Sequence, residues 1–252
     1  MKQMTEKEYY KQEVKQSGSI LSRLENFWYH YKWHSIVAVI LIFAIVVCSL
    51  QMCEKEDYDL GILYAGSYVI DRSSDSNDVS EYTTFLSSLK RVVEDNNEDG
   101  ESTVTLSSLF VLSEEEIEKI ESQSGYEVNY TLMENDKQIL IDSMSHSEYY
   151  VCFVSVGVYE EYCKTADGQS FFLPLGSYLP EEHSLKLYSD NAVYLSSSTF
   201  YDLPGICNLP EDTLICLRMK SALANHFNKG SNEKAFANSE KTIRQILAYP
   251  AV

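Results

Sequence analysis

Residues 35–53 read SIVAVILIFAIVVCSLQMC, a run of nineteen residues without one formal charge. As an α-helix this run is about 28 Å long, close to the roughly 30 Å hydrocarbon core of a bilayer. Eleven of the fifteen residues at 36–50 are Ile, Val, Leu or Phe. At about −0.3 to −0.6 kcal/mol each, those side chains favour membrane insertion by roughly 3–7 kcal/mol. The run therefore predicts one transmembrane helix over residues 35–53.

The residues before this run fit a membrane interface. An aromatic belt at the headgroup level is expected from Trp28, Tyr29, Tyr31 and Trp33. Lys32 and Arg23 are placed to extend toward the headgroups. A cleaved signal peptide fits poorly, because a polar tail of 34 residues comes first and no small-x-small cleavage site follows. A buried core helix would not usually be apolar all round and also carry an aromatic belt.

The charge distribution predicts which side of the membrane each part occupies. Residues 1–34 carry six basic and four acidic side chains, whereas residues 54–252 carry 14 basic and 34 acidic ones. Because Lys and Arg accumulate on the cytoplasmic side, we expect a cytoplasmic tail and an extracytoplasmic domain. The net charge of −18 argues against a nucleic-acid partner, which needs a basic footprint.

The tail, residues 1–34, ends in an amphipathic stretch. Apolar residues recur at helical spacing at Leu21, Leu24, Phe27 and Tyr31. Ser22 with Glu25 has the pattern of a capping box at a helix start. We expect a short interfacial helix here, and the alternative is that these residues form the first turns of the transmembrane helix.

Residues 54–252 alternate between strand-like and helix-like patterns. Strands are expected at 58–65, 102–111, 126–132, 149–156, 191–196 and 213–219, and helices at 78–93, 113–125, 136–145, 157–164 and 233–248. This alternation predicts an α/β domain with a mixed or mainly parallel sheet. About 200 residues suffice for one good core, so we expect a single acidic domain.

Two of these helices carry start signals. Asp78 is the expected N-cap of the first, whose apolar stripe is formed by Val79, Tyr82, Leu86, Leu89 and Val93. Ser113 with Glu116 makes a capping box for the second. Leu112 and Ile117 are spaced as the hydrophobic staple that accompanies such a box.

Two stretches of the chain resemble known families. The junction HYKWHSI at 30–36, with YDLGILYAG at 58–66, resembles uncharacterised single-pass membrane proteins of low-GC Gram-positive bacteria. Residues 134–175 are similar to the core of extracellular solute-binding proteins of ABC importers. The similarity rests on a helix with Gln138, Leu140 and Met144, on EYYVCFVSVGVYEEY at 148–162 and on FFLPLGSYL at 171–179. It implies an outer domain like one periplasmic-binding-protein lobe, whereas the family has two lobes joined by a hinge.

The six cysteines do not form a metal motif. They are Cys48, Cys53, Cys152, Cys163, Cys207 and Cys216. The last four lie in the predicted outer domain, where two disulfides in three possible connectivities are conceivable. Cys152 and Cys216 fall in apolar strands, so we expect free buried thiols at these two positions. There is no C-x-x-C spacing, which argues against zinc and thioredoxin-like chemistry.

No catalytic motif stands out. The five histidines, His30, His34, His146, His183 and His226, show no H-E-x-x-H or comparable spacing. There is no G-x-S-x-G elbow and no glycine-rich phosphate loop. We therefore expect a non-enzymatic protein with no catalytic, cofactor-binding or metal-ligating residue.

Residues 95–100, DNNEDG, match the first half of a calcium loop. Asp95, Asn97 and Asp99 would supply oxygens, and Gly100 would make the sharp turn. The twelfth position, which should be a bidentate glutamate, is Leu106. We therefore favour a solvated turn, where Asn, Asp and Gly gather for backbone reasons.

These observations predict a single-pass membrane protein with a non-enzymatic extracytoplasmic domain. Its leading function is ligand sensing or solute binding, and the alternative is an accessory or interaction subunit of a membrane complex without a small ligand. An interlobe cleft would favour the first, and a shallow surface with one exposed apolar patch would favour the second. The partners expected are the lipid bilayer and either a small molecule or another membrane protein.

Overall fold

The computed structural model describes residues 20–53, 58–70, 80–96, 99–124, 128–146, 149–165, 168–220 and 229–250. The chain divides into two compact units, Met1–Glu56 and Asp57–Val252. This division lies close to the predicted start of the outer domain at residue 54. The two units are described separately below.

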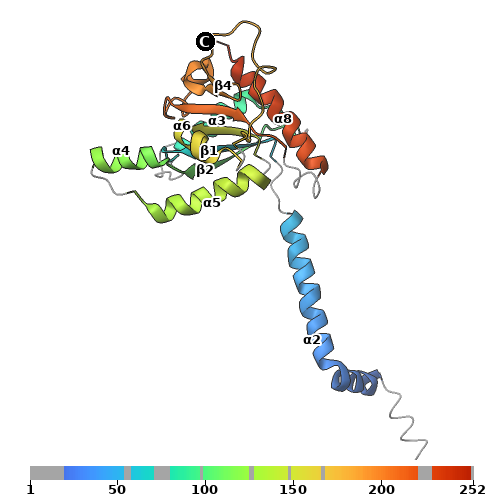
Figure 1. The fold of residues 1–252 in the computed structure, drawn as a ribbon. Coiled ribbons are helices and arrows are strands. Elements are labelled where there is room, and N and C mark those ends of the chain that lie inside the picture. The colour runs from blue at the N-terminus through green and yellow to red at the C-terminus, as the bar shows by residue number, and fades with distance from the viewer. Residues whose placement is uncertain are drawn as a thin grey trace, which may run out of the picture. The chain divides into compact units, whose positions relative to one another are not determined.

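The first unit contains one continuous helix, α2, Ile20–Cys53 (Figure 1). Its segment Phe27–Cys48 has a mean hydropathy of 2.1 and is long and apolar enough to cross a membrane. Ser22 lies inside α2, so the separate interfacial helix predicted to begin there is not present and the alternative, that these residues form the first turns of one long helix, is found. The amphipathic stretch and the apolar run form one helix because no Gly or Pro interrupts them.

The second unit is built around one six-stranded mixed sheet in the order β2-β1-β3-β6-β5-β4. The strands are β1 Leu60–Gly66, β2 Val104–Phe110, β3 Val151–Ser155, β4 Leu187–Ser189, β5 Ala192–Tyr194 and β6 Thr213–Leu217. Strand β1 is parallel to both β2 and β3. The pairs β3–β6, β6–β5 and β5–β4 are antiparallel. The predicted mixed α/β fold is therefore confirmed.

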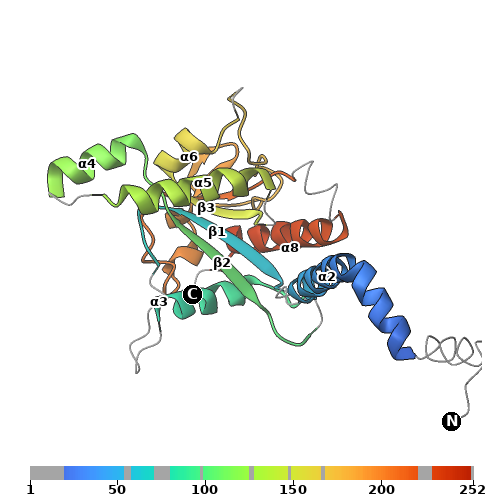
Figure 2. The same ribbon diagram turned by 90° about the horizontal axis from the view of Figure 1, so that it is seen from below.

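Helices cover both faces of this sheet (Figures 1 and 2). They are α3 Glu81–Leu89, α4 Glu114–Ser124, α5 Tyr130–His146, α6 Val156–Tyr162 and α8 Lys229–Leu247, with 3₁₀ turns η1 Lys90–Val92, η2 Leu195–Ser197 and η3 Thr199–Asp202. Helices α3 and α8 share one core with Ile62 and Tyr64 of β1. Helices α5 and α6 share the other core with Leu63 and Ala65. We call these the α3 face and the α5 face.

Strand β1 is buried on both faces along its whole length. Its Ile62 pairs with Leu106 on one side and Val151 on the other. A parallel strand covered by helices on both sides is expected to be almost continuously apolar, as LGILYAG is. The run that read as a strand from the sequence is therefore the centre of the parallel part of the sheet.

The capping box predicted for the helix at 113–125 is confirmed. The Ser113 backbone N–H donates to Glu116 Oε2 at 2.7 Å, and the Glu116 N–H donates to Ser113 Oγ at 3.2 Å. Leu112 and Ile117 belong to one small apolar cluster, as the staple predicts. Helix α4 therefore begins where its sequence signal indicates.

Two local predictions are wrong. Over its described part, 128–132, the segment predicted as a strand is not one, because α5 begins at Tyr130 and Asn129 Oδ1 accepts the Leu132 N–H at 3.1 Å. Residues 126 and 127 lie outside the described residues. The alternation of apolar and polar residues here is short, and the hydrogen bond from the Leu132 N–H to the Asn129 side chain stabilises the start of a helix instead of a strand. Helix α3 is capped by Ser80, whose Oγ accepts the Thr83 N–H, rather than by Asp78, which lies outside the described residues.

The apolar stripe predicted for α3 is also displaced. The buried residues of α3 are Phe85, Ser88 and Leu89, whereas Tyr82 and Leu86 are only half-buried. Ser88 is buried because its hydroxyl donates to the Pro204 backbone oxygen at 2.7 Å. A polar side chain thus occupies a position that an apolar periodicity cannot identify.

Candidate functional site

The parallel strands end together at one edge of the sheet, which we call the carboxyl edge. After β1 the chain passes to α3 on one face, and after β3 it passes to α6 on the other. Strands β1 and β3 are neighbours. Adjacent strands whose connections leave on opposite faces form a topological switch point, where open α/β sheets bind their ligands. The carboxyl edge of β1 and β3 is therefore the candidate site.

Small residues lie at this edge on the α3 face of three neighbouring strands: Gly66 and Ser155 end β1 and β3, and Thr213 begins the antiparallel β6. Gly66 follows the Ala65–Val154 pair, and Ser155 is the register partner of Thr213. We call Gly66, Ser155 and Thr213 the terminal row. A Cβ on Gly66 would lie 2.7 Å from Tyr64 Oη, so this glycine leaves room for the phenol. Tyr64 Oη in turn accepts the Tyr68 N–H at 3.1 Å.

Three polar groups from different segments meet beside this row. Tyr68, after β1, donates its hydroxyl to Glu81 Oε1 at the start of α3. Asn208 Nδ2 donates to the same carboxylate oxygen at 2.7 Å. Burial and the adjacent Glu81 carboxylate raise the pKa of Tyr68 to about 12. Tyr68 therefore stays protonated at neutral pH and acts as a hydrogen-bond donor.

On the α5 face the edge is closed by this chain's own carboxylates. Glu116 accepts from the N–H of Ser113, and Glu161 Oε1 accepts the Glu114 N–H at 2.9 Å. A Cβ on Gly157 would lie 2.4 Å from Ser113 Oγ, so α4 and α6 meet at a residue without a side chain. The N-terminus of α4, a natural anion site, is already filled by internal anions.

Burial and charge together define what the edge can do chemically. Burial is the main cause that raises the pKa of Tyr64, and nearby carboxylates, including Asp212, raise it further. The groups present are hydroxyls, an amide and carboxylates. They are suited to hydrogen-bonding an uncharged or cationic small molecule, and the carboxylates would repel an anion.

Residues 95–100, for which a solvated turn was predicted over a calcium loop, contain internal hydrogen bonds. Asp95 Oδ2 accepts the Gly100 N–H at 2.8 Å, and Asp99 Oδ1 accepts the Glu101 N–H at 2.9 Å. Gly100 has φ +93°, the left-handed conformation that a tight turn uses. Asn97 lies outside the described residues. Within the described part of the chain, no three His, Cys, Asp or Glu side chains are placed to share a metal ion.

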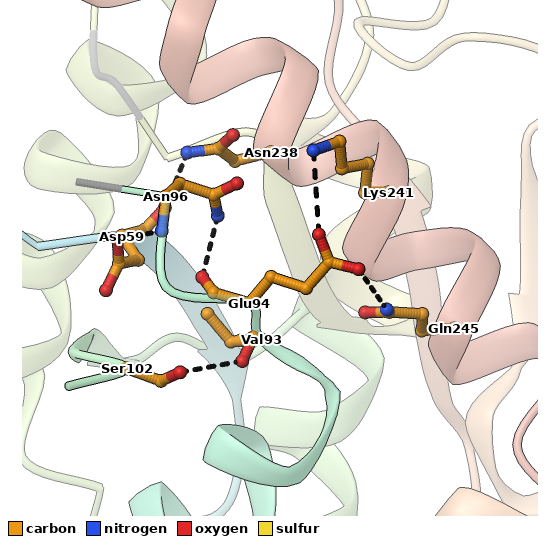
Figure 3. A network of polar contacts seen from close by, with 8 residues as sticks. All are labelled: Asp59, Val93, Glu94, Asn96, Ser102, Asn238, Lys241 and Gln245. Carbon is orange, nitrogen blue, oxygen red and sulfur yellow. Dashed lines mark hydrogen bonds and ion pairs between the residues drawn. The ribbon is translucent and has the colours of Figure 1, made fainter. Parts of the chain in front are cut away.

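Figure 3 shows how this loop is joined to β1 and α8. Asp59 Oδ1 accepts the Asn96 N–H at 2.8 Å, and Asn238 Nδ2 donates to the Asp59 backbone oxygen at 3.2 Å. Glu94 contacts α8 through Lys241 Nζ at 3.6 Å and Gln245 Nε2 at 3.2 Å. These contacts hold residues 94–96 against α8 and the residue before β1. They favour a structural turn at 95–100 over a calcium site.

The cysteines lie mostly in the core. Cys152 and Cys216 are free, buried and opposite each other on β3 and β6, as predicted for free buried thiols. Cys163 is also free and buried, whereas Cys207 and Cys48 are free and exposed. Burial raises the pKa of the Cys152 thiol to about 12, with Arg218 acting in the opposite direction. The three buried thiols are therefore poor nucleophiles.

The other sequence candidates do not gather at the carboxyl edge. His146 Nδ1 lies 3.1 Å from Asp142 Oδ1 on α5, and His226 lies outside the described residues. The described residues of the stretch at 134–175, for which a resemblance to solute-binding proteins was expected, lie in α5, β3, α6 and the loop that follows through 171–179. Within it, Leu140 and Met144 are buried in the α5-face core, and Gln138 is exposed.

Several residues of the edge carry no sequence motif. Strand pairing brings Thr213 beside the end of β1, and Glu81 of α3 reaches the same edge through its contact with Tyr68. In the sequence, only the position of Gly66 directly after an apolar run indicated that a strand ends here. Comparisons with known protein families, with curated proteins and with solved structures found no match in any of the three.

Proposed function

We propose that this chain is a membrane-anchored, non-enzymatic protein whose acidic α/β domain lies outside the cytoplasm and senses or captures a small ligand. The observation that carries this proposal is the switch point between β1 and β3, where Tyr68, Glu81 and Asn208 present hydrogen-bonding groups. Such an edge is where sheets of this kind bind ligands. The resemblance to one lobe of a solute-binding protein points in the same direction.

The anchor is the apolar segment of α2. Each of Trp28, Tyr29, Tyr31 and Trp33 is exposed on this helix. Exposed aromatic rings at one end of an apolar helix are typical of a bilayer interface. With the tail cytoplasmic, the acidic domain would meet solutes outside the cell.

The ligand class follows from the charges at the edge. Two carboxylates, Asp212 and Glu116, are close enough to the buried Tyr64 phenol to raise its pKa. Glu81 accepts a hydrogen bond from Asn208 at the same edge, and Glu116 also occupies the start of α4. An anionic ligand would meet repulsion from these carboxylates, and the start of α4, which could offset it, is already occupied by Glu116 and Glu161. The proposal is therefore an uncharged or cationic ligand, such as a sugar, an amide or an amine.

Thermal unfolding of the full chain in detergent tests this function. The probes are neutral and cationic amino acids, glucose and maltose, each added separately. A ligand at about 100 times its Kd adds about 2.7 kcal/mol of stability, which raises the melting temperature by roughly 5–10 °C. Glu81→Gln should remove that rise, whereas Glu118→Gln, an exposed change on α4, should not.

A second candidate, an accessory subunit of a membrane complex, is favoured by one observation. Residues Asp57–Val252 form a single compact unit around one sheet, and its described residues contain no second lobe that closes over a ligand. If no probe raises the melting temperature and cross-linking in native membranes captures another membrane protein on this domain, the subunit function replaces ligand sensing.

A further inference from the structure

Thr213 is the feature of the carboxyl edge that the fold does not explain. The residue is 1% exposed, and its Oγ1 has no hydrogen-bond partner within the described structure. A buried hydroxyl without a partner destabilises a fold, and valine has nearly the same shape without that cost. Within the described structure, the Thr213 hydroxyl therefore has a hydrogen-bonding capacity that no residue meets.

The position of Thr213 indicates where that group lies. Ile215 and Leu217 of β6 face the α3-side core, so strand alternation places Thr213 on the same face. Its register partner Ser155 is next to Gly66, where the chain has no side chain. The Thr213 hydroxyl thus belongs to the terminal row at the switch point.

The neighbouring phenol has spare donor capacity. Tyr64 Oη accepts the Tyr68 N–H, and its own proton has no acceptor among the described residues. The Asp212 carboxylate, adjacent in sequence to Thr213, is close enough to raise the pKa of Tyr64. A group bound at the terminal row would therefore meet two buried hydroxyls beside a carboxylate, which disfavours an anion.

We infer that the Thr213 hydroxyl hydrogen-bonds an uncharged oxygen-bearing group that is not part of this chain. The oxygen comes either from a ligand at the carboxyl edge or from an ordered water molecule, since both present the same hydrogen-bonding chemistry. That the oxygen belongs to a ligand rests on the proposed function. That the Thr213 hydroxyl has a hydrogen-bond partner does not depend on it.

The Thr213→Val variant of the full chain in detergent tests the contact. Loss of one buried hydrogen bond should lower the melting temperature by about 2–4 °C. Thr105→Val, a half-buried change on β2, is the matched control for placing valine in this sheet and should not lower it. A Thr213→Val variant that melts at or above the wild-type temperature would overturn the inference, because the hydroxyl would then have been without a partner.

Native mass spectrometry of the full chain distinguishes the two sources. A ligand appears as an added mass on the wild-type protein that decreases at least severalfold in Thr213→Val. A lowered melting temperature without an added mass assigns the oxygen to water, so the contact holds although no ligand has been found. An added mass equally retained by Thr213→Val and wild type, together with unchanged melting, removes Thr213 from the binding site.

Discussion

Arg218 donates from Nη1 to the backbone oxygen of Met144 at 3.0 Å, which ties the segment after β6 to the last turn of α5. Its Nε donates to the Tyr149 backbone oxygen at 3.1 Å, and its guanidinium lies 4.9 Å from the centroid of the Tyr150 ring. The side chain is 1% exposed, and burial lowers its pKa. Met144 supplies one of the carbonyls that a helix C-terminus leaves without an internal partner. A buried cation therefore completes the end of α5.

Arg218→Met should destabilise the domain by about 2–4 kcal/mol, because two buried carbonyls lose a charged donor. Arg244→Met is the matched control. Arg244 also donates to a backbone oxygen and lies over a tyrosine ring, but it is exposed, so a loss of about 0.5–1 kcal/mol is expected. Denaturant unfolding should be followed by the near-ultraviolet signal of tyrosine, since both tryptophans lie in α2. Equal losses for the two variants would contradict the role given to burial.

Gly157→Ala should destabilise the domain by about 1–3 kcal/mol. Its Cβ would lie 2.4 Å from Ser113 Oγ and 2.6 Å from Glu116 Oε2, so the capping box of α4 would have to shift. Gly176 has nothing within 4 Å of the same position, and Gly176→Ala should be neutral or gain up to about 1 kcal/mol. The measurement is denaturant unfolding of both variants. Similar stabilities would mean that α4 and α6 do not meet closely at Gly157.

Calcium should have little effect on this protein. Asp95 and Asp99 are engaged with backbone N–H groups, and Leu106 replaces the closing glutamate. Fewer ligands leave the affinity at or beyond the millimolar end of the calcium range, so about 1 mM calcium should shift the melting temperature by less than about 2 °C. A larger rise that disappears on Asp95→Ala or Asp99→Ala would make the loop a metal site.

Alkaline pH should weaken the domain through its tyrosines. Burial and neighbouring carboxylates raise the pKa of Tyr68, Tyr178 and Tyr188 from 10.0 to about 12. The folded state holds these protons more tightly than the unfolded chain does. Their contribution is therefore complete below pH 10 and is lost as the pH rises toward 12. Stability measured by denaturant unfolding should fall across this range, and Tyr68→Phe should make the fall shallower. A flat profile would contradict the shifted titration.

The orientation across the membrane is open to direct measurement. With the tail cytoplasmic, protease added to intact cells should degrade residues 54–252 and spare the tail, because the bilayer and the cell exclude the enzyme. Lysed cells treated in the same way provide the control, in which both parts are cut. Digestion of the tail with protection of the domain would reverse the topology.

Much of the fold is predictable from local sequence. The apolar run at 35–53 predicted an apolar helix, and Phe27–Cys48 of α2 meets the length and hydropathy required to span a bilayer. The strands at 58–65 and 213–219 were found as β1 and β6 because buried strands are apolar along their length. The start of α4 was found because a capping box acts within four residues.

Other features depend on contacts between distant segments. Residues 126–132 alternate like a strand, yet α5 begins at Tyr130 and Val128 packs with Leu112 and Met133. Arg218 is a single charge after an apolar strand in the sequence, but it is buried because the end of α5 and the residues before β3 supply acceptors 74 and 69 residues away. Composition and periodicity contain no information about such partners.

The sequence by itself determined the helix with membrane-spanning length, the α/β layering and the capped start of α4. Each depends on residues that are neighbours along one helix or strand. Only the tertiary structure decided the strand order, and with it the meeting of Gly66, Ser155 and Thr213 in one row. The physical reason is that strands pair through backbone N–H and C=O groups, which almost every residue has. The sequence therefore contains no pattern that shows which side chains the pairing of two strands brings together.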